Sequence, residues 1–226
     1  MTDRGALVYF YPMSDEADTV LPKLYAIVDA STTRARGLTI ANFAEELRAA
    51  GVTLVQYRDK EGSPQEVLAG ANAVRAAFSN FKCRLVINDR ADLALLAGYD
   101  GVHVGQDDLS VADAVRVLGP GKLLGVSTHT EEQVRTANLT EAAYVAIGPV
   151  FGTATKADAA ATVGLDGVRR ARALTTKPLV AIGGITRGNV RSVVDAGADS
   201  IAIISALFAE GESIEKVAGD FLDLFR

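Results

Sequence analysis

The stretch LVINDRADLALLAGYDGVHVGQDDL, residues 85 to 109, contains two short apolar runs separated by a segment of helical period. Each run leads into carboxylates, since Asp89 follows LVIN, and Asp107 and Asp108 follow GVHVGQ. Short apolar runs bounded in this way are typical of buried strands in a parallel sheet. Carboxylate oxygens just past neighbouring strands are ligands that suit a hard cation such as Mg²⁺. The stretch therefore predicts a metal site at the end of a parallel sheet.

The same alternation continues from Lys23 onward, where short Val-, Ile- and Leu-rich runs alternate with longer stretches of helical period. The predicted strands are 24–29, 53–60, 84–89, 100–105, 122–127, 143–148, 178–184 and 200–205. The predicted helices are 41–50, 64–78, 91–97, 110–118, 130–137, 165–174, 187–196 and 213–225. Eight strand–helix units in roughly 200 residues predict an α/β fold, the single-domain (β/α)₈ TIM barrel, with its active site at the carboxyl ends of the strands. An open doubly wound sheet is the alternative.

Local signals set several boundaries of these elements. Ser63 followed by Pro64 predicts a helix N-cap with proline in the first turn. Residues 1–22 are predicted to be an N-terminal extension, packed on or trailing from a catalytic barrel of residues 23–226. The longest irregular segment between predicted elements is 151–164, and loops of that length are usually functional or disordered.

Bulk composition excludes several classes of protein. The 226 residues carry 28 acidic and 23 basic side chains, a net charge of −5, which gives no general attraction to nucleic acid or to an anionic membrane. The apolar run ALVYFY at 6–11 is far shorter than the roughly 20 residues that span a bilayer. Cys83 is the one cysteine, so an intramolecular disulfide is impossible and a reducing, cytoplasmic location is expected. A homo-oligomer is compatible with the sequence.

The second predicted strand ends in QYRDK, which places Gln56, Arg58 and Lys60 at alternate positions. Alternate residues of a strand point to one face, so these side chains are predicted to line the barrel mouth. An arginine fork beside a lysine charge suits a diphosphate better than a carboxylate. The alternative is a solvated polar end to a strand.

Polar residues also close the third, fourth and fifth strands. Asn88 and Asp89 follow the third, and a single Asp in such a place is more often a helix N-cap or turn residue than a ligand. Spacing alone does not choose between Asp107 and Asp108 after the fourth strand. GVSTHT then places Ser127 at the mouth. Within it Thr130 is the predicted cap of the next helix, while His129 stays undecided and His103 fits a core role as well as a functional one.

The last three strands lead into loops suited to anions. GPVFGTATK carries the hydroxyls of Thr153 and Thr155 and the ammonium of Lys156, although a surface loop has a similar composition. The loops after strands seven and eight, AIGGIT and IIS, occupy the positions where such barrels frequently bind phosphate. Gly183 and Gly184 allow the backbone to approach a phosphate closely, but a tight turn requires glycine too.

The predicted site combines two anion-binding regions and a hard-metal pair, and lacks a serine or cysteine nucleophile paired with a base. This combination indicates an enzyme that joins two phosphorylated substrates. A metal-bound diphosphate is a good leaving group once its charge is neutralised, so the protein has to stabilise that charge and position the acceptor.

Seven ordered motifs resemble the thiamine phosphate synthase family: QYRDK (56–60), INDRADLAL (87–95), GVHVGQDDL (101–109), GVSTHT (125–130), GPVFGTATK (148–156), IGGIT (182–186) and IIS (203–205). The resemblance implies a (β/α)₈ barrel that joins hydroxymethylpyrimidine diphosphate to a thiazole phosphate and releases diphosphate with Mg²⁺ bound. It also implies a dissociative mechanism, in which diphosphate leaves first and the thiazole nitrogen attacks a pyrimidine-methyl cation.

The resemblance also implies roles for individual residues. The pyrimidine diphosphate ligands would be Gln56, Arg58, Lys60, Asn88, Ser127 and Lys156, with the catalytic roles assigned to Arg58, Lys60, Ser127 and Lys156. The Mg²⁺ ligands would be Asp89 and Asp108, a choice over Asp107 that rests on resemblance alone. The thiazole contacts would be Thr153 and Thr155, and the thiazole phosphate would lie in a backbone cradle at Gly184, Ile204 and Ser205. Tyr57 and Asp59 depart from the family pattern, on the face predicted to point away from the site.

Two alternatives remain at this point. A thiazole tautomerase would resemble this family in fold and sequence but need not bind a diphosphate and a metal. A non-catalytic phosphate-binding barrel would need no metal pair and would tolerate the loss of Asp89. The residues that argue against the tautomerase are Arg58, Lys60, Asn88, Asp89, Asp108 and Lys156.

Overall fold

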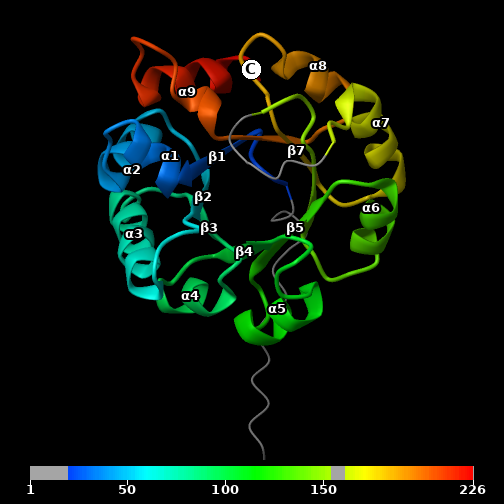
Figure 1. Ribbon diagram of the computed structural model, residues 1–226, viewed down its shortest axis with the longest axis horizontal. Coiled ribbons are helices and arrows are strands. Elements are labelled where there is room, and N and C mark those ends of the chain that lie inside the picture. The colour runs from blue at the N-terminus through cyan, green and yellow to red at the C-terminus, as the bar shows by residue number, and fades with distance from the viewer. Residues whose placement is uncertain (1–19, 154–160, 226) are drawn as a thin grey trace, which may run out of the picture.

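The predicted strands close into a parallel barrel, so the alternative of an open doubly wound sheet is wrong. The structure, a computed structural model, describes residues 20–153 and 161–225. Strands pair in chain order and the last returns to the first: β1 (Leu24–Asp29), β2 (Leu54–Arg58), β3 (Arg84–Asn88), β4 (Gly101–Val104), β5 (Leu123–Thr128), β6 (Tyr144–Ile147), β7 (Leu179–Ile182) and β8 (Ser200–Ile203). Figure 1 shows these strands enclosed by a ring of helices.

The eight predicted helices are present, with ends that differ from the prediction by up to three residues: α2 (Ile40–Ala49), α3 (Pro64–Ala77), α4 (Ala91–Leu96), α5 (Val111–Leu118), α6 (Glu131–Asn138), α7 (Gly164–Leu174), α8 (Val190–Asp195) and α9 (Ile214–Asp223). The predicted caps of α3 and α6 are confirmed. The hydroxyl of Ser63 and the carboxylate of Glu66 form a reciprocal capping box at α3, and Thr130 and Gln133 form another at α6.

Two short elements were not predicted, α1 (Ala30–Ala35) and the 3₁₀ turn η2 (Ser205–Leu207). The α1 sequence ASTTRA has no apolar period and two β-branched residues, so its propensity for helix is low. It begins because the carboxylate of Asp29, the last residue of β1, accepts a hydrogen bond from the Thr32 amide at 2.9 Å. A side chain at the barrel mouth therefore starts this helix.

Side-chain alternation along the strands builds two apolar layers. In β1, Leu24 and Ala26 pack outward with the helices, while Tyr25 and Ile27 belong to a second cluster inside the barrel. Tyr57 packs in the outer layer, which confirms the prediction that it points away from the site. The remaining members of the inner cluster are Leu21, Leu54, Val86, Tyr144, Ala146, Val180, Ala202 and Ile204. Because side chains fill the interior, a ligand cannot enter the barrel and has to bind at the rim formed by the carboxyl ends of the strands.

The parallel register brings the functional strand ends to one rim. Asp29 of β1 is level with Arg58 of β2, and Asn88 of β3 is level with His103 of β4. β2 ends at Arg58, two residues earlier than predicted, so Lys60 lies in the turn after the strand. The alternation rule therefore does not apply to Lys60.

Most of the predicted N-terminal extension, residues 1–19, lies outside the described residues. Its last residues lie against the barrel: Arg84 Nη2 donates to the carbonyl of Val20 at 3.1 Å, and Leu21 is buried in the inner cluster. The boundary between residues 22 and 23 stays a prediction. Within 20–153 and 161–225, none of the helices has the length and apolar character needed to cross a bilayer.

Candidate active site at the carboxyl ends of the strands

Asp89 and Asp108 come from adjacent loops, after β3 and β4. Asp89 has φ 62°, a left-handed conformation that is unusual for a residue other than glycine, and its amide donates to the carbonyl of His103 at 2.8 Å. Neither acid caps a helix, but Asp108 fits the turn-residue interpretation, because its Oδ2 accepts from the Gly105 amide. α4 starts after Arg90 with no side-chain cap among the described residues, and Ser110 caps α5. Strained backbone that serves no cap is typical of functional sites.

The two carboxyl groups perturb each other strongly. The pKa of Asp89 is raised to about 6, first by burial and then by its hydrogen bond with Asp108, while Lys60 acts in the opposite direction. Burial also disfavours the ionised form of Asp108, but hydrogen bonds from Asp89 and from the Gly105 amide, 2.9 Å away, lower its pKa overall. The two acids therefore ionise in succession, Asp108 first and Asp89 at higher pH, because two like charges this close repel each other.

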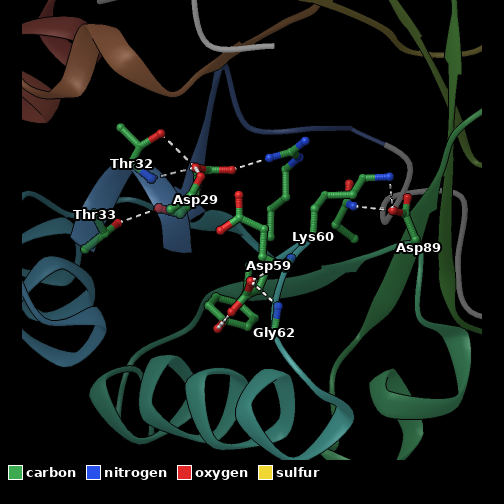
Figure 2. A network of polar contacts seen from close by, with 12 residues as sticks. Asp29, Thr32, Thr33, Asp59, Lys60, Gly62 and Asp89 are labelled. Carbon is green, nitrogen blue, oxygen red and sulfur yellow. Dashed lines mark hydrogen bonds and ion pairs between the residues drawn. The ribbon is translucent and has the colours of Figure 1, made fainter. Parts of the chain in front are cut away.

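Lys60 and Asn88 both contact the Asp89 carboxylate. Lys60 Nζ lies 2.5 Å from Asp89 Oδ2, and Asn88 Nδ2 donates to the same oxygen at 2.6 Å. Figure 2 shows Lys60 extended toward Asp89 across the mouth of the barrel. The Lys60 side chain is 48% exposed, so its ammonium also remains accessible to a ligand. The structure therefore brings these three predicted site residues together.

Arg58 is held by a residue that sequence reasoning missed. Asp29 is 1% exposed; its Oδ2 pairs with Arg58 Nη1, and its Oδ1 accepts from Ser31 Oγ and Thr32 Oγ1 at 2.8 and 2.7 Å. Figure 2 shows this network at the start of α1. Burial raises the pKa of Asp29, but the bonds from Thr32, Ser31 and Arg58 lower it more, so the carboxylate stays ionised. The sequence feature that could have indicated Asp29 is its position as the last residue of a predicted strand.

Asp59 points away from this rim, as predicted. Its carboxylate accepts from the amides of Glu61 and Gly62 at 3.2 and 3.0 Å and lies 3.4 Å from Arg34 Nη1. Figure 2 shows Asp59 facing Gly62 and not Asp89. It therefore shapes the turn that carries Lys60.

Gln56 lies deeper in the barrel than predicted for a residue of the mouth. It is 3% exposed, and its Nε2 donates to the hydroxyl of Tyr25 at 2.9 Å. Ser127 is half-buried at the end of β5, where its Oγ is 2.8 Å from His103 Nε2. Tyr144 connects the two contacts, because its hydroxyl bonds both Tyr25 and His103. A side-chain network inside the barrel therefore joins Gln56 to Ser127, and His103 belongs to it as a hydrogen-bonded histidine.

His129, left undecided by the sequence, braces the next loop. Its amide donates to Gln133 Oε1 at 2.7 Å, and its Nδ1 lies 2.5 Å from the carbonyl oxygen of Gly148. Gly148 begins the GPVFGTATK loop, so His129 connects the loop after β5 to the loop after β6. The contact supports a structural role for this histidine.

The loops proposed to hold the second substrate meet at the rim. Gly184 has φ 64°, and a Cβ there would lie 2.6 Å from the carbonyl oxygen of Gly152. This close approach of the loops after β6 and β7 requires glycine. Ile204 is 7% exposed and Ser205 is exposed at the start of η2. Thr153 is half-buried beside Gly152, while Thr155 and Lys156 lie outside the described residues.

The sequence model of the family described as "Thiamine monophosphate synthase" matches residues 24–207. The chain belongs to this family. Thiamine-phosphate synthase of Koribacter versatilis is 52% identical over 192 residues, which cover 84% of this chain and 90% of that one. Thiamine-phosphate synthase of Chloroflexus aurantiacus is 44% identical over 187 residues, 83% and 85% of the two chains.

A solved structure gives the same result for the fold. Thiamine phosphate pyrophosphorylase from Pyrococcus furiosus superimposes with a TM-score of 0.79 at 29% identity, covering 93% of this chain and 98% of that one. The similarity confirms the predicted (β/α)₈ barrel. Membership of the family identifies the chain as a transferase enzyme of thiamine biosynthesis.

Proposed function

We propose that this enzyme joins hydroxymethylpyrimidine diphosphate to thiazole phosphate, forming thiamine phosphate and diphosphate, with Mg²⁺ assisting the departure of diphosphate. The main support is the Asp89–Asp108 pair, which lies beside Lys60 and on the same rim as Arg58. Two acids and two cations in one place suit a metal-bound diphosphate.

The residues present fit Mg²⁺. Among the described residues, no group of three or more His, Cys, Asp and Glu side chains could form a closed protein cage for a metal. Mg²⁺ usually takes one or two carboxylates and completes its shell with water and substrate phosphates. Asp89 and Asp108 repel each other when both are ionised, as the raised pKa of Asp89 reflects, and a cation beside them would relieve this repulsion. When bound, Mg²⁺ would neutralise charge on the leaving diphosphate.

The cationic side chains of the rim then bind the diphosphate of the first substrate. Arg58 offers a planar fork held in place by Asp29, and Lys60 offers a point charge on a half-exposed side chain beside Asp89. Lys156, from the loop after β6, is proposed as a third cation by family resemblance. Asn88 and Ser127 donate hydrogen bonds at the same rim, and Gln56 contacts the pyrimidine from below.

The chemistry we propose is dissociative. The bond between the pyrimidine methylene carbon and the diphosphate oxygen breaks first, and the electron pair leaves with the diphosphate. The thiazole nitrogen then donates its lone pair to the resulting cation and forms the new carbon–nitrogen bond. No protein nucleophile is required, because Arg58, Lys60, Ser127 and Lys156 stabilise the leaving group and do not bond to carbon.

The second substrate would lie across the loops after β6, β7 and β8. Thr153 and Thr155 are proposed to contact the thiazole ring. Its phosphate would lie against the backbone at Gly184, Ile204 and Ser205, and the missing Cβ at Gly184 lets the loops after β6 and β7 approach each other closely there. This arrangement places the acceptor on the opposite side of the mouth from the carboxylate pair.

Diphosphate release, assayed with both substrates, tests the proposal. We expect turnover with Mg²⁺, none in excess chelator, and at least a ~10²-fold loss in Asp89→Asn or Asp108→Asn, the scale of losing a charge-stabilising group. Asp107→Asn is the matched control, since this neighbouring carboxylate is also exposed, and the variant should keep near-normal turnover. Undiminished activity in chelator would refute the metal assignment. Thiazole isomerisation without diphosphate release would favour the tautomerase.

A further inference from the structure

A continuous chain of side-chain hydrogen bonds crosses the barrel interior from Gln56 to Ser127. Gln56 Nε2 is 2.9 Å from Tyr25 Oη, which is 2.9 Å from Tyr144 Oη. Tyr144 Oη is 3.0 Å from His103 Nδ1, and His103 Nε2 is 2.8 Å from Ser127 Oγ. Each member comes from a different strand. The chain therefore connects two proposed substrate ligands through three residues to which no function has been assigned.

The middle of the chain is rigidly packed. Tyr25 and Tyr144 are 1% and 0% exposed and meet edge to face, with ring centroids 6.0 Å apart. The His103 ring stacks on Tyr144 at 5.6 Å. Tyr144 lies directly over Gly125, where a Cβ would be 2.0 Å from the ring. Neither ring can turn without repacking the inner core, so their polar atoms have fixed positions.

The Gln56 end sets the direction of the hydrogen bonds. An amide nitrogen can only donate, so Tyr25 accepts from Gln56 and its single proton is left to donate to Tyr144. Tyr144 in turn donates to His103 Nδ1, which must then lack a proton. In the reverse arrangement Tyr144 would donate to Tyr25, whose oxygen would accept two hydrogen bonds while its own buried proton found no acceptor within the chain. The stated direction is the one in which both tyrosine protons are donated within the chain.

This direction has a consequence for the exposed end of the chain. With Nδ1 as acceptor, neutral His103 carries its proton on Nε2 and donates it to Ser127 Oγ. Ser127 then has its own proton free to donate elsewhere. The Ser127 backbone is fixed as well, because Gln106 Nε2 donates to its carbonyl at 2.6 Å. The hydroxyl is thus oriented as a donor at the rim of the barrel.

We propose that His103 and Tyr144 are positioning residues that hold the Ser127 hydroxyl as a hydrogen-bond donor toward the anionic ligand at the barrel mouth. Identification of that ligand as a diphosphate rests on the proposed function. Burial raises the pKa of both Tyr25 and Tyr144 and disfavours their phenolates, so the two hydroxyls keep the protons that they donate along the chain. The chain therefore orients a donor and transfers no proton.

The first test is the protonation pattern of His103, which needs no turnover. The sequence has two histidines, so ¹⁵N spectra of imidazole-labelled protein can be assigned with a His129→Gln variant. We expect His103 as the neutral Nε2–H tautomer, and a mixture of tautomers in Tyr144→Phe. Tyr99→Phe is the matched control, since it also removes one buried hydroxyl, bonded at 2.9 Å to the Ala71 carbonyl, away from the chain. An Nδ1–H tautomer in the wild-type protein would overturn the proposal.

The second test measures binding of inorganic diphosphate with Mg²⁺ by calorimetry. We expect Tyr144→Phe and His103→Leu to weaken binding about tenfold, the usual effect of losing one oriented hydrogen bond, with Tyr99→Phe unchanged. His103→Gln, which can present a donor near the Nε2 position, should restore part of the loss. Equal affinity in all variants would overturn the positioning role. If the tautomer and binding results hold but no diphosphate is released from the pyrimidine substrate, the proposed function fails and the positioning role stands.

Discussion

One carboxylate, that of Asp29, both starts α1 and holds Arg58. Its Oδ1 accepts the Thr32 amide at 2.9 Å while its Oδ2 pairs with Arg58 from the neighbouring strand. The ion pair is largely buried, since the side chains are 2% and 14% exposed. The first helix and the diphosphate-binding arginine are therefore fixed by the same residue.

Asp29→Asn should separate these two roles. Asparagine is an equally good N-cap, so α1 keeps its cap while Arg58 loses its counter-charge. Removing one partner of a buried pair costs about 3–5 kcal/mol of unfolding free energy, and Asp29→Ala should cost about 1 kcal/mol more through loss of the cap. Denaturant unfolding measures both. We also expect a higher KM for the pyrimidine diphosphate in both variants; an unchanged KM would show that Asp29 does not orient Arg58 for binding.

We also expect the Asp29 carboxylate to contribute stability that is lost in acid. Its folded pKa is lowered, so the folded chain holds this proton less tightly than the unfolded chain. The contribution is present above the ordinary value of 3.8 and is lost as the pH falls through the lower folded value. In unfolding measured from pH 5 downward, Asp29→Asn should show a shallower loss of stability than wild type. Parallel profiles would contradict this.

In the metal-free protein, we expect Asp89 to make the free energy of unfolding depend on pH with the opposite sign. Because its folded pKa is raised from 3.8 to about 6, folding takes up a proton between these values, and stability falls as the pH rises through this window. The shift corresponds to about 3 kcal/mol at most. Asp89→Asn should remove this slope and be more stable than wild type at pH 7, since asparagine tolerates φ 62°. Urea unfolding in chelator between pH 4 and 8 measures it; the same slope in both proteins would exclude Asp89 as its source.

A substitution at Gly184 should affect the binding of thiazole phosphate more than that of the pyrimidine diphosphate. Alanine there would place Cβ 2.6 Å from the Gly152 oxygen and 2.7 Å from the Phe151 Cβ, in a left-handed conformation that alone costs about 1–2 kcal/mol. We expect Gly184→Ala to lower stability and to raise the KM for thiazole phosphate more than that for the pyrimidine diphosphate. Gly188→Ala is the control in the same loop, because its Cβ would have 3.8 Å to the nearest described atom. Equal KM values for Gly184→Ala and wild type would remove Gly184 from the site.

The sequence predicted the barrel and the acid pair because both depend on local pattern. Strand-like runs followed by helical period specify the βα units, and the closing residues of adjacent parallel strands necessarily share a rim. Asp89 and an acid after β4 could be found in this way, whereas the choice of Asp108 over Asp107 rested on family resemblance. Lys60 was predicted by strand alternation, which does not extend beyond Arg58, and it reaches Asp89 through the length of its own side chain.

What the sequence did not predict depends on contacts between distant residues. Tyr25 and Tyr144 are 119 residues apart, and each is an ordinary core tyrosine until their hydroxyls meet. Asp29 is an unremarked strand end until β1 pairs with β2 and brings Arg58 level with it. Gln56 was predicted at the mouth because alternation gives the face of a strand and not the depth within the barrel. Such relationships require the register and the packing of the inner core.

A pair of glycine substitutions tests how tightly the inner core fixes Tyr144. Gly125→Ala would place Cβ 2.0 Å from ring atoms of the fully buried Tyr144, and overpacking of this kind costs about 1–3 kcal/mol. Gly219→Ala, in the interior of α9 with no described atom within 4 Å of the added Cβ, should instead stabilise by up to about 1 kcal/mol. Thermal unfolding should therefore shift in opposite directions for the two variants. In Gly125→Ala the displaced ring should also break the contact with His103 Nδ1, so we expect weaker diphosphate binding, whereas Gly219→Ala should bind as wild type does. A Gly125→Ala protein with wild-type stability would show that the ring moves freely and that the hydrogen-bonded chain is not rigid.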